Sequence, residues 1–322
     1  MSPASEITGI HHITAIAGDA QENLDFYTNV FGMRLVKRSV NQDDPGTYHL
    51  FYADAKGNPG TDLTFFPFRF SSPGQMGVGL GVEIALAIPK GSLEYWQTRL
   101  NDMGAKVGGT ESRRGDRALT LVDPHGQHLA VVEAPSRRDF APWDQSSVPA
   151  DKQVIGLHAV RMWEREMALT ASFLTEVLGF ESFGEEDGWH RFGVGGGGSG
   201  EHLELRELPN EKRGAWGVGT MHHVAWRVAD EGVELRLRDR IAKANRRPTD
   251  VIDRFWFKSV YFLEPGGVLF ELATEGPGFT ADEPLEHLGE TLVLPPWLEP
   301  HRSQIEASLP PLTGSPSTRA AP

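Results

Sequence analysis

Two His-His pairs and one glutamate are the residues whose types and positions could do chemistry in this chain. The pairs are His11-His12 and His222-His223, and each lies at the start of a short apolar stretch typical of a strand. Glu271 lies within a run of apolar residues, where an unpaired carboxylate would be costly to bury. Two neutral imidazoles and one carboxylate form the facial triad of non-haem iron(II) sites, which leaves coordination positions open. The same ligands also suit Mn(II), Ni(II) or Zn(II).

An internal repeat indicates which histidine of each pair binds the metal. A shift of 147 residues aligns the first pair with His158-Ala159, and a shift of 211 aligns it with the second pair. Adjacent strand residues point to opposite faces, so only one histidine of each pair can face the interior. A metal ligand should be present only in the units that form the metal site. Ala159 shows that the third unit lacks the second histidine. We therefore predict His12 and His223 as ligands. Histidines hydrogen-bonded in a core are the alternative, which fits a single histidine better than two matched pairs.

The third ligand is expected on the last strand of the fourth repeat unit. Glu271 corresponds to Ala130 in the second unit and to Thr64 in the first. A glutamate found in one unit and absent from the others suggests a metal partner rather than a role in fold stability. The alternative is a strand residue that faces solvent.

The repeat also predicts the elements that must position these residues. Each unit reads as a short apolar strand, a helix and three further strands separated by Gly, Pro and Asn turns, a β-α-β-β-β pattern. In the first unit, Asp19 and Glu22 form a candidate helix cap. The apolar stripe of that helix is Leu24, Tyr27, Val30 and Phe31, and Gly32 follows it. We place the units at residues 7–70, 77–136, 153–209 and 217–276, followed by an extension and tail at 277–322.

The positions of the ligands predict how the units pair. A single unit cannot bury its own concave face, so two units must combine. The ligands come from the first and last units, which must therefore share one open barrel around the metal. Units 2 and 3 form the other barrel, and the fold class is α+β. In that second barrel Glu83 and Glu204 fall near the equivalent positions, but with no histidine between them we interpret both as structural or solvated.

Composition excludes several classes of protein. The formal net charge of −13 argues against a nucleic-acid partner, because a phosphate backbone requires a basic face. The chain has no cysteine, so disulfides, thiolate metal sites and a cysteine nucleophile are excluded. No apolar run approaches the ~20 residues that span a bilayer, and the N-terminus does not resemble a signal peptide. We expect a cytoplasmic enzyme without a membrane partner. Whether the chain forms a homo-oligomer stays an open question.

The repeated units, with histidine on a first strand and glutamate on a last strand, resemble the vicinal oxygen chelate superfamily, the glyoxalase/bleomycin resistance/dioxygenase fold. Within that superfamily the chain is similar to the hydroquinone ring-cleaving dioxygenases. The resemblance extends over about residues 7–312. It rests on the motifs at residues 9–14, 37–38, 48–50, 57–61 and 222–225, together with 276–280 and 294–296.

The resemblance implies that the metal is Fe(II), with Mn(II) as the alternative, and that its ligands are the three residues selected above. It implies catalytic roles for Thr14, His222, Arg254 and Tyr261, and places His11 near the pocket. The implied reaction is cleavage of the aromatic ring of a para-diol by O2, so a small aromatic diol and O2 are the expected partners.

Two other functions are compatible with the sequence. A glyoxalase-type isomerase or thiol transferase would share the fold, but it would use a fourth protein ligand where Thr64 stands. A non-catalytic protein that binds small aromatic molecules would not need Tyr261 and Arg254. Uptake of O2 separates these alternatives.

Overall fold

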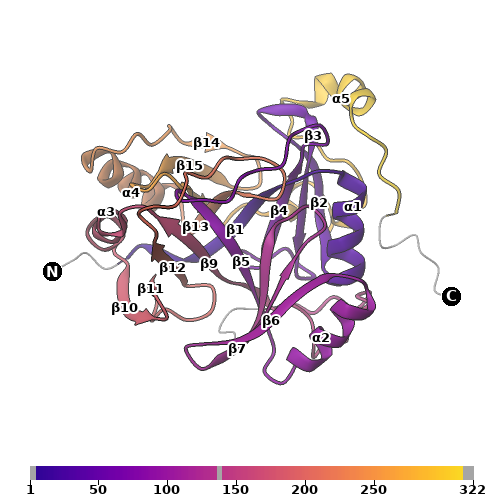
Figure 1. Cartoon of the computed structure of the whole chain (residues 1–322). Helices are drawn as coiled ribbons and strands as arrows, with labels where there is room; N and C mark the ends of the chain where they lie inside the picture. The colour runs from indigo at the N-terminus through magenta and orange to yellow at the C-terminus, as the bar shows by residue number, and fades with distance from the viewer. Residues whose placement is uncertain (1–4, 136–139, 315–322) are drawn as a thin grey trace.

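The computed structural model describes residues 5–135 and 140–314. The strands form two eight-stranded sheets, each curled into an open barrel (Figure 1). The first sheet has the order β14 (Ile252–Asp253), β15 (Lys258–Leu263), β16 (Leu269–Thr274), β13 (Met221–Val228), β1 (Ile7–Ala17), β4 (Asp62–Pro67), β3 (Asp44–Ala53) and β2 (Arg34–Asn41). The second has the order β10 (Glu181–Glu186), β11 (Trp189–Gly193), β12 (His202–Glu207), β9 (Gly156–Glu164), β5 (Leu80–Ile88), β8 (His128–Glu133), β7 (Asp116–Val122) and β6 (Lys106–Arg113).

The first sheet joins the first and last quarters of the chain. β1 lies antiparallel to β13, with Thr14 opposite His223. On the outer sides, β4 runs parallel to β1, and β16 runs parallel to β13. β5 and β9 form the same central pair in the second sheet. The predicted α+β class is confirmed, with units 1 and 4 in one barrel and units 2 and 3 in the other. The exact bounds of the four units stay a prediction.

The predicted helix of the first unit is present, but its second half has wider turns. α1 (Ala20–Asp25) continues directly into η1 (Phe26–Val30), which is π-helical. The Asp19 carboxylate accepts hydrogen bonds from the backbone N–H groups of Gln21 and Glu22, at 2.9 and 3.1 Å. The predicted apolar stripe is buried. Gly32 ends the segment at a φ of +65°, where a Cβ atom would lie 2.5 Å from Ser146 Oγ.

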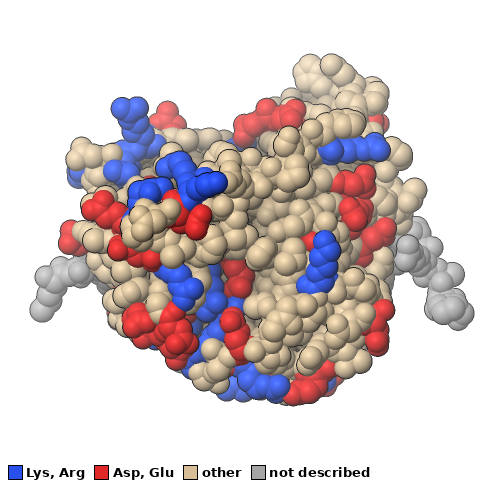
Figure 2. Space-filling view, viewed as in Figure 1, with Lys and Arg blue, Asp and Glu red and all other residues tan. Residues whose placement is uncertain are grey.

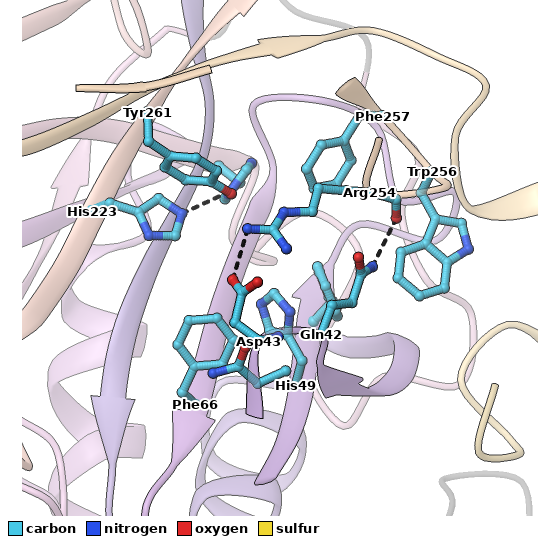
Figure 3. Close-up of a pocket in the computed structure, with 12 residues that line it drawn as sticks. Gln42, Asp43, His49, Phe66, His223, Arg254, Trp256, Phe257 and Tyr261 are labelled. Atoms are coloured by element: carbon cyan, nitrogen blue, oxygen red, sulfur yellow. Dashed lines mark hydrogen bonds and ion pairs between the residues drawn. The ribbon is translucent and has the colours of Figure 1, made fainter. Parts of the chain in front are cut away.

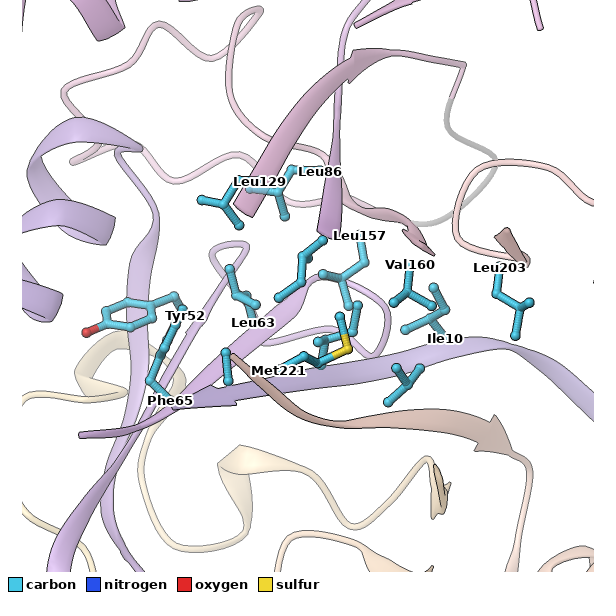
Figure 4. Close-up of a cluster of buried hydrophobic side chains, with 14 of the residues drawn as sticks. Ile10, Tyr52, Leu63, Phe65, Leu86, Leu129, Leu157, Val160, Leu203 and Met221 are labelled. Carbon is cyan, nitrogen blue, oxygen red and sulfur yellow. The ribbon is translucent and has the colours of Figure 1, made fainter. Parts of the chain in front are cut away.

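The other units repeat this arrangement. α3 (Met167–Ser172) continues into η2 (Phe173–Val177), whereas α2 (Leu93–Asp102) and α4 (Glu231–Lys243) are regular α-helices. The main apolar core extends from one sheet to the other: Ile10 and Leu63 of the first sheet belong to the same cluster as Leu86 and Leu157 of the second (Figure 4). No helix in the described part of the chain combines the length and apolar character needed to cross a membrane.

The segment that follows β16 is folded over the first unit. It contains η3 (Phe279–Ala281), η4 (Leu285–His287), η5 (Glu299–His301) and α5 (Arg302–Ser308). Lys37 is fully buried, and its Nζ donates to Asp282 Oδ1 at 2.7 Å, to the Phe279 carbonyl oxygen at 3.1 Å and to Glu283. Asp282 also accepts a hydrogen bond from Trp256 Nε1 at 3.0 Å. The extension is thus attached to the loop before β15. Most of the predicted tail, from residue 315, lies outside the described residues.

Candidate metal centre

His12, His223 and Glu271 converge on one point inside the first barrel. The two histidines lie on the central strands β1 and β13, and Glu271 lies beside them on β16. The two Nε2 atoms are 3.2 Å apart. Glu271 Oε2 lies 3.3 Å from His12 Nε2 and 2.9 Å from His223 Nε2. All three side chains are buried.

The contacts of Glu271 Oε2 fit a bound cation. This oxygen is buried and has no aligned hydrogen-bond donor within residues 5–135 and 140–314. A buried carboxylate oxygen without a donor is costly, and two imidazole nitrogens face the same point. A divalent ion would accept an electron pair from each of the three atoms. Among the described residues, this is the one group of three such ligands.

Burial and the neighbouring charges set the protonation states of the triad. Burial alone would raise the pKa of Glu271, but His12 and His223 hold this pKa well below its usual value. Burial lowers the pKa of His223. For His12, burial is outweighed by the attraction of Glu271, and its pKa is raised. Without a metal, the ionised carboxylate therefore favours a proton on His12, which an incoming metal ion must displace.

The first histidine of each pair contacts the second histidine beside it. His11 Nδ1 lies 2.9 Å from His12 Nδ1, and His222 Nδ1 lies 2.8 Å from His223 Nδ1. Burial lowers the pKa of both His11 and His222 to about 3, so each ring is neutral and can accept a hydrogen bond. A metal-binding histidine usually donates its other ring N–H to a partner that fixes its orientation. The two first histidines can serve as these partners.

Hydroxyl groups surround the triad on two sides. Ser259 Oγ donates a hydrogen bond of 2.5 Å to Glu271 Oε1. Thr14 Oγ1 lies 3.0 Å from His223 Nε2 and 2.7 Å from Thr64 Oγ1. Thr64 lies opposite Thr14 in the pair β1–β4, just as Glu271 lies opposite Ala225 in the pair β13–β16. The place of a fourth ligand is therefore held by a hydroxyl group that is hydrogen-bonded to Thr14.

A pocket with aromatic walls is lined by His12 and His223 of the triad (Figure 3). The hairpin between β2 and β3 forms part of its lining. Asp43 on this hairpin pairs with Arg254 at 2.9 Å, and Gln42 donates to the carbonyl oxygen of Arg254 at 3.0 Å. The guanidinium of Arg254 lies over the Tyr261 ring, 5.4 Å from its centroid. The walls that suit a flat aromatic ligand are Phe51, Phe66, Trp256, Phe257 and Tyr261.

The structure brings all eight predicted site residues together. Besides the triad, Thr14, His11 and His222 contact its two histidines, and Arg254 and Tyr261 line the pocket. Their functional roles stay predictions.

Sequence reasoning did not assign a role to Ser259, His49 or Asp43. Ser259 carried a usable signal, because alternate residues of a strand share a face and it stands two residues before Tyr261. His49 belongs to a motif of the resemblance. No sequence feature indicated a role for Asp43, because its partner Arg254 is distant in sequence.

The equivalent point of the second barrel is occupied by ion pairs. Arg113 binds Glu83 at 2.5 and 2.9 Å, and Glu204 is bound by Arg161 and Arg191, each at 2.9 Å. The floor beneath them consists of small side chains, among them Ala85, Ala130 and Ala159. Figure 2 shows acidic and basic groups gathered in the hollow between β10–β11 and β6–β7. Guanidinium groups thus neutralise the two glutamates there.

The family model described as "Glyoxalase/Bleomycin resistance protein/Dioxygenase superfamily" matches residues 9–131 and 156–272, which cover both barrels. The chain belongs to this superfamily. It is 40% identical to "Putative ring-cleaving dioxygenase MhqO" of Bacillus subtilis, over 96% of this chain and 97% of that protein. It is 31% identical to "Chlorohydroquinone/hydroquinone 1,2-dioxygenase" of Sphingobium indicum, over 95% of this chain and 97% of that protein.

Solved structures agree with this assignment. The crystal structure of a "putative dioxygenase" from Bacillus subtilis superposes with a TM-score of 0.89 at 39% identity, covering 96% of this chain and 99% of that one. Glyoxalase I from Zea mays superposes with a TM-score of 0.61 at 15% identity, covering 83% and 92%. At this low identity the maize enzyme shows a shared fold and nothing about activity.

Proposed function

We propose that this protein is a dioxygenase that opens the aromatic ring of a hydroquinone-type para-diol with O2, using Fe(II) held by His12, His223 and Glu271. The observation that carries the proposal is the convergence of two histidines and one glutamate at the end of an aromatic pocket. The substrate class is supported by the relative named for chlorohydroquinone and hydroquinone, and by the match along nearly the whole length of both chains. Mn(II) is the alternative ion for the same ligands.

When bound, Fe(II) would supply Lewis acidity and open coordination positions for the diol and O2. The pocket residues would bind and orient the substrate. Phe66 and Phe257 would hold the ring flat, and the aromatic walls keep water away from the triad. Burial raises the pKa of Tyr261, which therefore stays protonated at neutral pH and can donate a hydrogen bond to a substrate oxygen. Arg254 places a positive charge beside it, where it would stabilise negative charge on the substrate.

Thr64 argues against a glyoxalase-type isomerase. A site of that type would need a fourth ligand at this position, and the Thr64 hydroxyl is already hydrogen-bonded to Thr14 at 2.7 Å. The cytoplasmic location stays a prediction, and the oligomeric state stays open.

An oxygen electrode tests the proposal directly. The protein is loaded with Fe(II) without air, its iron content is measured, and O2 uptake is followed with hydroquinone, with chlorohydroquinone and with catechol. We expect uptake of one O2 per molecule of hydroquinone consumed, and faster uptake with the para-diols than with catechol. Iron-loaded protein that takes up no O2 with any para-diol contradicts the proposal. Conversion of the hemithioacetal of methylglyoxal would instead support the isomerase.

A further inference from the structure

A continuous chain of hydrogen-bonding groups connects the pocket wall to the ligand His223. His49 Nε2 lies 2.9 Å from Thr64 Oγ1, which lies 2.7 Å from Thr14 Oγ1, which lies 3.0 Å from His223 Nε2. Both threonines are completely buried, and His49 lines the pocket. The three members other than the ligand come from β1, β3 and β4, which are neighbours in one sheet. Such a chain has a direction, because each hydroxyl group has a single proton to donate.

A metal ion at the triad restricts this direction. In the metal-free protein, the Thr14 hydroxyl can donate to His223 Nε2. Once the lone pair of that nitrogen is bound to a metal ion, the nitrogen can neither accept nor donate a hydrogen bond. The proton of Thr14 then needs another acceptor. It turns either back toward Thr64 or toward an oxygen atom of a substrate beside His223.

The tautomer of His49 decides between these two directions. Burial lowers the pKa of His49, so the ring is neutral and carries a single N–H. The rings of Phe51 and Phe66 lie against it, with centroid distances of 3.8 and 4.3 Å. This packing holds the ring plane with Nε2 toward Thr64. If the N–H is on Nε2, Thr64 accepts from His49, donates to Thr14, and leaves the Thr14 proton free for the substrate.

We propose that His49 and Thr64 are positioning residues that orient the Thr14 hydroxyl as a hydrogen-bond donor to an anionic oxygen of the aromatic substrate. The order of donation is His49 Nε2–H to Thr64, Thr64 to Thr14, and Thr14 to the substrate oxygen. No covalent bond changes along the chain, whose effect is a fixed dipole aimed at negative charge. This inference rests on the proposed function, because it assumes an ionised diol beside His223.

The tautomer of His49 tests the chain without any turnover. Long-range ¹H–¹⁵N correlation spectra of the full chain, loaded with Zn(II) to avoid paramagnetic broadening, distinguish the two neutral tautomers. The spectrum of the His49→Gln protein identifies the resonances of His49. We expect the proton on Nε2. A proton on Nδ1 would make Nε2 an acceptor, reverse the chain and overturn the proposal, whatever the enzyme does with hydroquinone.

Turnover of threonine variants tests the consequence. Thr64→Val removes the linking hydroxyl at nearly constant volume, and Thr64→Ser retains it. Loss of a donor that touches an oxyanion costs about 10²–10³ in kcat, so loss of one that acts through Thr14 should cost about tenfold. We expect this loss in kcat per bound iron, an unchanged KM within twofold, and recovery in Thr64→Ser. Thr120→Val, at a partly buried position on β7 of the second sheet, is the control outside the site and should turn over like the wild type.

The two experiments separate the possible failures. If Thr64→Val binds iron normally and turns over at the wild-type rate, the positioning role is wrong while the dioxygenase proposal stands. If the wild type consumes no O2, the proposed function fails and the tautomer alone decides whether the chain runs from His49. If Thr64→Val loses its metal, the wild-type tautomer again decides the direction of the chain, because its measurement needs no variant of Thr64.

Discussion

Ser259 provides a sharp test of how the metal site is built, because sequence reasoning gave it no role. Its hydroxyl group donates to Glu271 Oε1 at 2.5 Å, and both side chains are fully buried. In Ser259→Ala, that carboxylate oxygen loses this donor. Hydrogen bonds to charged groups are worth about 1.5–3 kcal/mol. Removing a partner that orients a ligand typically weakens metal binding by about 10–100-fold. At about 1.4 kcal/mol per factor of ten, the two ranges agree.

The assay is competition for Zn(II) between the protein and a chelator of known affinity at pH 7. Ser39→Ala is the matched control, because Ser39 on β2 is also a fully buried serine of the first sheet. Its hydroxyl has no hydrogen-bond partner within the described residues. We expect Ser39→Ala to bind Zn(II) like the wild type and Ser259→Ala to bind it at least tenfold more weakly. Equal affinity of all three proteins would show that the strand alone positions Glu271, and would refute this reasoning.

Three further substitutions test other parts of the structure. Burial, and after it the neighbouring charge of Glu264, raises the pKa of Glu164 to about 9. Glu164 therefore takes up a proton on folding, and the free energy of unfolding falls as the pH rises from the unfolded-state pKa toward 9. Glu164→Gln should raise the free energy of unfolding in urea by about 2 kcal/mol at pH 8 and by clearly less at pH 5; an equal gain at both pH values contradicts this. Arg254→Lys keeps the charge but loses the planar guanidinium between Asp43 and Tyr261, so steady-state kinetics should show kcat/KM reduced by about 10–100-fold at normal iron content. Lys37→Met leaves two acidic residues of the C-terminal extension without their buried cation and should lower the free energy of unfolding by about 3–5 kcal/mol; unchanged denaturation would mean that the extension is not attached through Lys37.

The arrangement of the barrels could be predicted because one of the repeat units lacks the second histidine. Ala159 stands where the third unit would need the second histidine, so the site had to lie between the first and last units. The structure places β1 beside β13 accordingly. Burial of Glu271 was also predictable, because a carboxylate within an apolar strand needs a partner.

Other features depend on geometry that spacing does not encode. The apolar positions Leu24, Tyr27 and Phe31 fit an α-helix and a π-helical turn equally well, so the wide turn of η1 gave no signal. The contact between Asp43 and Arg254 joins a hairpin tip to a loop from the opposite end of the chain. The contact between His49 and Thr64 depends on the register between β3 and β4, in which Thr64 lies opposite Phe51, and only the folded sheet fixes this register.

The central claim is that His12, His223 and Glu271 bind the metal, and a comparison of two glutamates tests it most directly. Glu271 and Glu204 occupy equivalent places on β16 and β12 of the two barrels, and both are buried. Iron bound per chain is measured after anaerobic loading with Fe(II) and gel filtration, for the wild type, Glu271→Gln and Glu204→Gln. The structure predicts one iron in the wild type and in Glu204→Gln, and a large loss in Glu271→Gln. Full iron content in Glu271→Gln would contradict the claim.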